Sequence, residues 1–444
     1  MIFGIVSIPL LFAMAMGIDY ATNARRWTQL NVAADAAALA AVTQQMLSQP
    51  DDVAANAARD MFIGQTTGMN NLQFNPATDL SIAIADHVDT QHFTGFTRTA
   101  TVSYTALASN IFSGLLGQPG MTLSGSHQAT GSQPPNVNFY LLLDSSPSMG
   151  IAGTVAGFQQ MIAATPAQGG CAFACHEKYP PVCPTETDVC GNPHGAPGTP
   201  YAKGVDNYML AKNYLNPPVV LRIDLVNSAV QALLQFAQQA EQGLQSYQVS
   251  INTFDVAVNP VGAQTIGALT PDLNSLAQQL SVNPIQQFEV YDHDSATGAA
   301  NVANGDMDWP DAIATMNAVM PDPGNGTNLP GDKPLGVLFI VTDGVQDLNG
   351  GPHTEVPALM SPATCTAIKN RNIRIAILYT EYLPMPTSAS YIKYVAPFQG
   401  QIASNLASCA SLGLFSTVTQ NQDISAALVA LFQATLAARS YLSQ

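Results

Sequence analysis

The feature that most constrains this chain is a set of strand-like segments, most of them largely apolar, which alternate with helical segments in its last 307 residues. The strand-like segments lie at 138–143, 247–254, 336–342 and 373–380, and the helical segments at 222–241, 309–320, 361–372 and 423–442. The segment 247–254 alternates apolar and polar residues, and the other three are nearly continuous apolar runs. Continuous apolar strands separated by helices are typical of a mostly parallel sheet that is covered on both faces. We therefore expect an α/β fold with a doubly wound, mostly parallel sheet.

The amino terminus predicts a membrane segment. The first 18 residues, MIFGIVSIPLLFAMAMGI, carry no ionisable side chain, and as a helix they would be about 27 Å long, close to the thickness of a hydrocarbon core. A cleaved secretion signal normally has a basic start, which is missing here, although AMA at 13–15 imitates a cleavage site. We expect a retained transmembrane anchor at 1–20. The alternatives are a cleaved signal and a buried core helix.

Between the anchor and the α/β domain the pattern changes twice. Residues 21–49 form a strong helical segment without Gly or Pro, and DDVAANAARDMF at 51–62 favours a second helix. Apolar and polar residues then alternate across 80–130, as in half-buried strands. We expect a small α+β module of pilin-like outline over 21–130, a linker at 131–136, and the α/β domain over 137–444 with an insert at about 151–221.

The first apolar strand of the domain ends in the motif D-S-S-P-S-M-G at 144–150. Asp144, Ser146 and Ser148 alternate, so one irregular turn can direct all three side-chain oxygens to a single point. Asp343 follows the apolar strand 336–342 in the same way. Ligands of such sheets bind beyond the carboxyl ends of the strands. Carboxylate and hydroxyl oxygens suit Mg²⁺, or Mn²⁺ or Ca²⁺, better than zinc.

The pattern D-x-S-x-S after one strand and T-D-G after another resembles the metal-ion-dependent adhesion site (MIDAS) of von Willebrand factor type A domains, over 138–442. The resemblance implies a Rossmann-like fold, two serines bound directly to the cation, two aspartates acting through water, and a partner carboxylate that completes the shell. The family's third loop supplies a threonine, but ANGDMDWPDAI at 303–313 has Met307 near that position. Asp308 or Asp306 can substitute, and Thr327 is a weaker replacement. The alternative is that these residues cap a strand and a helix without metal.

A second resemblance concerns the amino-terminal half of the chain. IPLLFAMAMGIDYATNARRWTQLNVAADAAALAA is similar to the start of the TadE/TadG-like proteins of Flp (Tad) pilus assembly. Together with the von Willebrand type A pattern, the cysteine-bearing insert GCAFACHEKYP and the late LASCAS, the chain resembles the TadG group. This resemblance implies an inner-membrane protein with a single span, most of whose chain is periplasmic.

The arginines after the apolar segment and the cysteines indicate different cellular compartments. Arg25 and Arg26 follow the apolar segment, and by the positive-inside rule they would place the bulk of the chain in the cytoplasm. The even number of cysteines instead favours disulfides and therefore an oxidising compartment. We give the cysteines more weight. The disulfide candidates are Cys171, Cys175, Cys183, Cys190, Cys365 and Cys409.

The sequence does not determine how the six cysteines pair. The four cysteines of the insert allow three disulfide pairings, and a zinc site that adds His176 or His194, or free thiols, are the alternatives. For Cys365 and Cys409 we expect a separate bridge, with two unrelated buried thiols as the alternative.

The net charge and the absence of catalytic motifs argue against two classes of function. With 14 Lys and Arg against 30 Asp and Glu the net charge is −16, which disfavours binding to nucleic acid. The sequence lacks a G-x-S-x-G elbow, a Walker loop and an H-E-x-x-H motif, so an enzyme is not expected. We expect a non-enzymatic, membrane-anchored protein of pilus assembly that binds a protein partner through a divalent cation. An envelope or surface adhesin and a metalloenzyme centred on the insert are the alternatives.

Overall fold

The computed structural model describes residues 2–89, 95–111, 120–165, 170, 172, 210–241, 246–255, 262–282, 284–285, 308–347, 357–385, 391–419 and 422–436. The chain divides into two compact units. The N-terminal unit consists of Met1–Asn136, Gly243–Gln245 and Asn325–Lys333, and the C-terminal unit consists of Val137–Gln242, Ser246–Gly324 and Pro334–Gln444.

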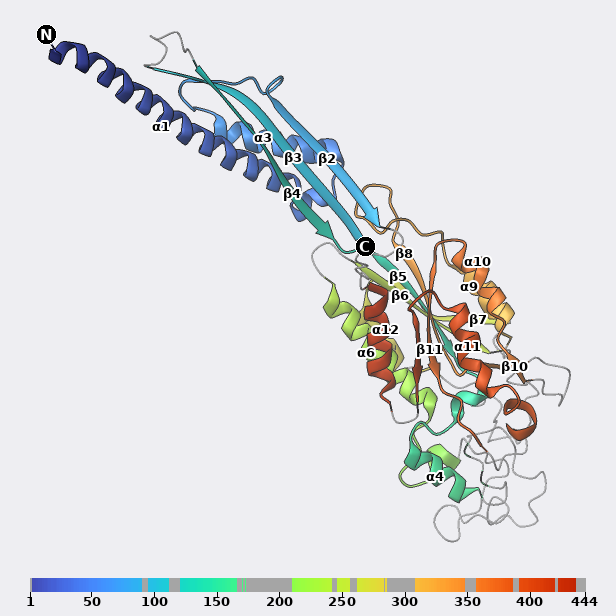
Figure 1. Cartoon of the computed structure of the whole chain (residues 1–444). Helices are drawn as coiled ribbons and strands as arrows, with labels where there is room; N and C mark the ends of the chain where they lie inside the picture. Colours follow the sequence, from blue (N-terminus) through green and yellow to red (C-terminus); the bar gives the residue numbers. More distant parts are fainter. Residues whose placement is uncertain are drawn as a thin grey trace, which may run out of the picture. The chain divides into compact units, whose positions relative to one another are not determined.

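In the N-terminal unit, two helices pack on one face of an antiparallel sheet (Figure 1). The helices are α1 (Ile2–Ala41) and α3 (Asp51–Thr66), with the short α2 (Gln44–Leu47) between them, and the strands are β1 (Leu72–Gln73), β2 (Leu80–Asp89), β3 (Gly95–Ser109) and β4 (Gly120–Gln133). Alternate residues of β3, such as Ala100, Val102 and Tyr104, are buried beneath the helices, as expected for a half-buried strand. Small side chains of α1 permit close packing, since Ala33, Ala37 and Ala41 are fully buried.

Two boundaries in this unit differ from the sequence expectation. The helix predicted to run to residue 49 ends at Ala41, because Thr43 takes an extended conformation and its hydroxyl caps α2 by accepting from Met46 N. Residues 131–133, assigned to a linker, belong to β4, where they pair with Phe96–Arg98 of β3. In the part of the chain that the structure describes, no helix combines the length and the apolar character that a membrane span requires.

A fully buried arginine joins the sheet of the N-terminal unit to its helices. Arg98 on β3 makes two hydrogen bonds to Asp86 of β2, at 2.7 and 2.6 Å, and one to Asp51 of α3 at 2.8 Å. Its Nη1 donates to the carbonyl oxygens of Met46 and Gln49. All three guanidinium nitrogens therefore have acceptors, as the burial of a permanent charge demands.

The C-terminal unit contains the predicted doubly wound sheet. Its six strands lie in the order β12-β11-β8-β5-β6-β7, and all adjacent pairs are parallel except β6 with the edge strand β7. The strands are β5 (Val137–Asp144), β6 (Tyr247–Asp255), β7 (Gly262–Thr270), β8 (Leu335–Thr342), β11 (Arg374–Thr380) and β12 (Phe415–Val418). Chain order reverses between β5 and β8, which makes this pair the switch point of the sheet.

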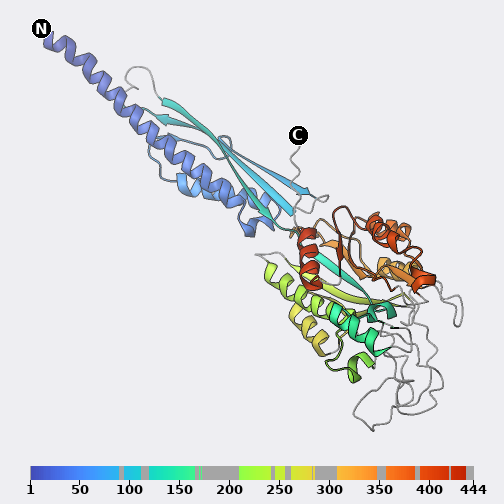
Figure 2. The same cartoon turned by 60° about the horizontal axis from the view of Figure 1, so that its bottom comes forward.

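Helices cover both faces of this sheet (Figures 1 and 2). One face carries α6 (Arg222–Ala240) and α12 (Ile424–Leu436), and Phe432 of α12 packs on Phe139 of β5 with ring centroids 4.5 Å apart. The other carries α9 (Trp309–Val319), α10 (Thr366–Lys369) and α11 (Gln399–Cys409), which share a core with Tyr140 and Leu142. The remaining elements are α4 (Val155–Ala164), α7 (Leu273–Val282), and a hairpin of β9 (Val345–Asp347) and β10 (Pro357–Leu359).

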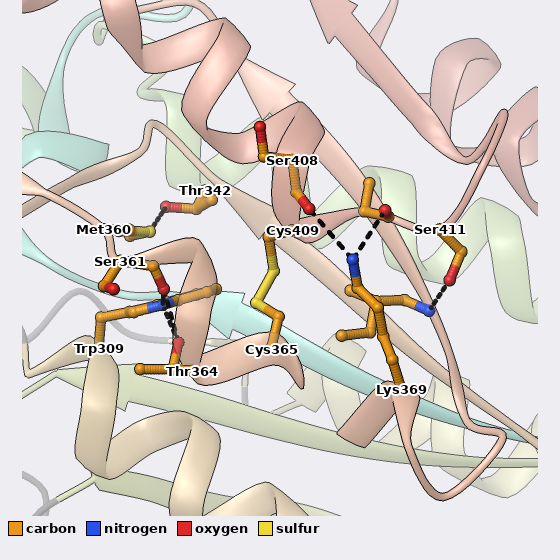
Figure 3. Close-up of a disulfide and its surroundings, with 12 residues drawn as sticks. Trp309, Thr342, Met360, Ser361, Thr364, Cys365, Lys369, Ser408, Cys409 and Ser411 are labelled. Carbon is orange, nitrogen blue, oxygen red and sulfur yellow. Dashed lines mark hydrogen bonds between the residues drawn. A yellow bond between two sulfur atoms is a disulfide. The ribbon is translucent and has the colours of Figure 1, made fainter. Parts of the chain in front are cut away.

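A disulfide joins Cys365, at the turn before α10, to Cys409, at the end of α11 (Figure 3). Both cysteines are buried and their Cα atoms are 5.5 Å apart. Lys369 binds the same segment, because its Nζ donates to the carbonyl oxygens of Ser408 and Ala410. The bridge thus fastens two helices of one sheet face to each other. The other four cysteines, at 171, 175, 183 and 190, lie outside the described residues.

Candidate metal centre

The two aspartates of the sequence motifs lie side by side at the switch point. Asp144 is the last residue of β5 and Asp343 directly follows β8, and β5 and β8 are paired in parallel. Both strands are buried on both faces, and both aspartates are fully buried. The carboxyl ends of the two central strands therefore deliver two carboxylates to one edge of the sheet.

The loop after β5 folds its hydroxyl groups back onto Asp144. Ser146 donates to Asp144 Oδ1 from its backbone N–H at 3.0 Å and from its hydroxyl at 2.5 Å. The Oγ atoms of Ser146 and Ser148 are 3.0 Å apart, at the start of a short 3-10 turn (Pro147–Gly150). The structure thus brings together Asp144, Ser146 and Ser148, the three side chains that the alternating pattern directs to one point.

The loop after β8 is held against the same carboxylate. Thr342 donates its hydroxyl to Asp144 Oδ2 at 2.6 Å and accepts from Gly344 N at 3.0 Å. Val345 N donates to Asp343 Oδ1 at 3.2 Å. Gly344 has φ of 78°, and a Cβ there would lie 2.4 Å from Ile402 of α11, so only glycine fits this turn.

Burial raises the pKa of both carboxyl groups, and repulsion by Asp343 adds to this effect at Asp144. The pKa of Asp144 rises to about 7, first because the group is removed from water and second because of the charge of Asp343. Desolvation also raises the pKa of Asp343, and the charge of Arg222 opposes this effect. Arg222 Nη1 is 3.9 Å from Asp343 Oδ2, an attraction between charges but too long for a hydrogen bond. Within the described residues, this oxygen is buried without a hydrogen-bond partner.

These residues fit a hard divalent cation. The donors are all oxygens, the two carboxylates offset the cation's charge, and the unsatisfied Oδ2 of Asp343 can accept from a cation-bound water. Within the described residues no three His, Cys, Asp or Glu side chains form a metal-binding group. The cluster has two such side chains, and its other donors are hydroxyls. This donor set agrees in type with Mg²⁺, Mn²⁺ or Ca²⁺.

The candidates for the third loop have other contacts. Asp308 is the N-cap of α9, where its carboxylate accepts from Asp311 N at 3.0 Å. Thr327 donates to Asp332 at 2.6 Å, and both residues belong to the N-terminal unit. Asp306 and Met307 lie outside the described residues.

Sequence reasoning gave no role to two residues of the cluster, Thr342 within T-D-G and Arg222. Thr342 looks like the last position of an apolar strand, and its role depends on Asp144, which is 198 residues away. Arg222 begins α6, and its charge lies beside Asp343. One signal was available for Arg222, because a basic residue at the first position of a helix opposes the helix dipole.

Comparison with known proteins gives one family match, at the amino terminus. Residues 1–45 match the family model described as "Putative Flp pilus-assembly TadE/G-like". This match covers all of α1, its buried alanines included, and the turn that follows it. No curated protein sequence matches the chain.

Several solved structures are similar at low identity. Proximal thread matrix protein 1 from the mussel byssus, with a zinc-occupied MIDAS motif, is 8% identical with a TM-score of 0.33, over 68% of this chain and 48% of that one. The PilB minor pilin from Streptococcus sanguinis is 8% identical with a TM-score of 0.31, over 80% and 77%. The von Willebrand factor domain of the type V pili tip protein Mfa5 from Porphyromonas gingivalis is 11% identical with a TM-score of 0.28, over 67% and 94%. The chain spans about half the length of the mussel protein.

Proposed function

We propose that this chain is a non-enzymatic, membrane-anchored protein of Flp (Tad) pilus assembly that binds a protein partner through a divalent cation. The cation is Mg²⁺, Mn²⁺ or Ca²⁺, held by Asp144, Ser146, Ser148 and Asp343 in the manner of a MIDAS. The observation that carries the proposal is the pair of fully buried carboxylates with adjacent hydroxyls at the switch point of the sheet.

The chemistry of the cluster supports binding rather than catalysis. When bound, the cation would supply a Lewis-acid position to which a partner's carboxylate can attach. A nucleophilic serine normally donates its hydroxyl to a base such as histidine, which takes the proton. The hydroxyl of Ser146 instead donates to Asp144 and lies beside the hydroxyl of Ser148. These contacts favour a ligand role for both serines.

Two observations support the pilus context and the anchor. The family model of TadE/G-like pilus assembly matches residues 1–45. Large apolar side chains in this region are exposed, among them Leu10, Leu11, Met14 and Ile18. Apolar side chains that are exposed along one helix indicate contact with a membrane or with another protein. We propose that residues 1–20 anchor the chain in the inner membrane with its bulk in the periplasm, where the bridge between Cys365 and Cys409 is stable.

The test uses Asp144→Ala in the native gene, with Asp322→Asn as the matched control because Asp322 is an exposed aspartate of the same unit. We expect Asp144→Ala to abolish piliation at an unchanged protein level, and Asp322→Asn to leave it unchanged. Normal piliation with Asp144→Ala would refute the cation-bridge proposal. Recovery of the chain outside the cell without its first residues would instead favour the envelope adhesin.

A further inference from the structure

Arg222 lies where the loops of three strands meet. Its backbone N–H donates to Ile151 O at 2.8 Å in the loop after β5, and its Nη2 donates to Glu381 O at 2.7 Å directly after β11. Its Nη1 lies 3.9 Å from Asp343 Oδ2, directly after β8. The guanidinium is therefore fixed at the sheet edge that carries the candidate metal centre.

The stability of α6 does not explain an arginine at this place. A positive charge in the first turn faces the positive end of the helix dipole, and burial to 7% exposure removes this charge from water. Asp224, two residues later, follows the usual rule, because its carboxylate accepts from Leu221 N at 2.8 Å and caps the helix. Arg222 opposes both preferences, and its compensation comes from the carbonyl oxygen of Glu381 and from the charge of Asp343.

We infer that Arg222 is a positioning residue of the cation site, a fixed counter-charge that holds Asp343 in place when no cation is bound and weakens the binding of the cation. This inference rests on the proposed function. Asp144, Asp343 and Arg222 together carry one negative charge when both carboxyl groups are ionised, and a bound divalent cation changes this to one positive charge. The arginine therefore stabilises the cation-free cluster and repels the cation, which makes cation binding readily reversible.

A small cavity lies beside the Arg222 side chain. The residue lines a cavity of about 20 Å³, enough for one water, together with Thr380, Thr419 and Gln422. These side chains offer hydroxyl and amide groups next to the guanidinium. The site thus admits one water beside the guanidinium, which lowers the cost of burying its charge.

The test compares cation affinity and cation-free stability in the full-length wild type, Arg222→Gln and Arg222→Lys. Mn²⁺ is titrated calorimetrically after removal of metals with EDTA. We expect Arg222→Gln to bind Mn²⁺ about tenfold more tightly or better, because one repelling charge near the cation is removed. We also expect it to unfold at a lower temperature than the wild type without Mn²⁺. Arg222→Lys keeps the charge and should bind within about threefold of the wild type.

The control is Arg371→Gln, which removes a positive charge from an ion pair with exposed Asp322 in the same unit and should leave the affinity unchanged. Equal or weaker binding by Arg222→Gln, while the wild type binds, would overturn the role of Arg222 and leave the cation site standing. Binding by Arg222→Gln alone would support the inference, whereas no binding by either protein would overturn both proposals. If Arg222→Gln is unfolded in EDTA, restoration of cooperative unfolding by Mn²⁺ but not by NaCl supports the inference, and no restoration overturns it.

Discussion

The burial of Asp144 predicts that the cation-free protein loses stability as the pH rises. The pKa of Asp144 is about 7 in the folded chain, against 3.8 for an exposed aspartate. Between these values the folded state holds a proton that the unfolded state has released. Because the folded state binds more protons in this window, raising the pH from about 4 to about 7 lowers the free energy of unfolding, and the difference in pKa is worth about 4 kcal/mol.

The substitution Asp144→Asn removes this dependence. Asparagine carries no charge. Its amide nitrogen cannot accept a hydrogen bond, so part of the contacts from Ser146 and Thr342 is lost, which lowers the free energy of unfolding by about 1–3 kcal/mol. Above pH 7 and without cation, we therefore expect Asp144→Asn to be about 1–3 kcal/mol more stable than the wild type. Below about pH 4 the order should reverse, because protonated Asp144 keeps its hydrogen bonds at no electrostatic cost.

The assay is urea unfolding in EDTA from pH 4 to 8, followed by tryptophan fluorescence in a Trp27→Phe background. The chain has two tryptophans, and Trp309 is fully buried against Phe254 in the C-terminal unit, so its signal reports on this unit. Carboxyl groups outside the cluster titrate alike in both proteins, so the difference between the two curves isolates Asp144 together with its coupling to Asp343. A difference that does not vary with pH would contradict the raised pKa of Asp144.

Three further substitutions test other parts of the structure. Arg98→Met should destabilise the N-terminal unit by about 3–5 kcal/mol, because the carboxylate of Asp86 stays half-buried without the Arg98 guanidinium. Thermal unfolding followed by circular dichroism measures this loss, and a value below about 1 kcal/mol would contradict the role of this network. Replacing Cys365 and Cys409 with alanine opens a 44-residue loop and should cost about 4 kcal/mol in urea unfolding, and a cost below about 1 kcal/mol would contradict a role of this bridge in stability. Asp308→Ala should cost about 1 kcal/mol through the lost cap of α9 and leave Mn²⁺ affinity unchanged; a large loss of affinity would show that Asp308 is a ligand.

Much of the α/β sheet was predictable because its central strands are buried on both faces. Residues 137–143 of β5 do not alternate between polar and apolar side chains, which is the pattern of a strand buried on both faces. The edge strands were not predicted, since β7 alternates small and polar residues and β12 has four residues. Helix α4 was missed as well, because it lies within the Gly- and Pro-rich insert. Edge strands and short helices depend on tertiary contacts that a local pattern does not carry.

The candidate site was predictable where its residues follow strands directly. The positions of Asp144, Ser146, Ser148 and Asp343 follow from the rule that parallel strands deliver their carboxyl ends to one edge. Arg222 and the role of Thr342 were missed because their partners are remote in sequence and because a helix start or an apolar strand explains each of them locally. The charge balance of the cluster was therefore available only from the structure.

Calorimetric titration of the full-length protein with Mn²⁺ measures directly whether the switch point of the sheet holds a cation. We expect one Mn²⁺ per chain in the wild type, and a loss of affinity of about 100-fold or more in Ser146→Ala with Ser148→Ala. The control is Ser145→Ala, because the Ser145 hydroxyl lies 3.5 Å from Phe254 O rather than in the cluster. Binding of equal strength in the double variant and the wild type, or a wild type that takes up no Mn²⁺, would contradict the account.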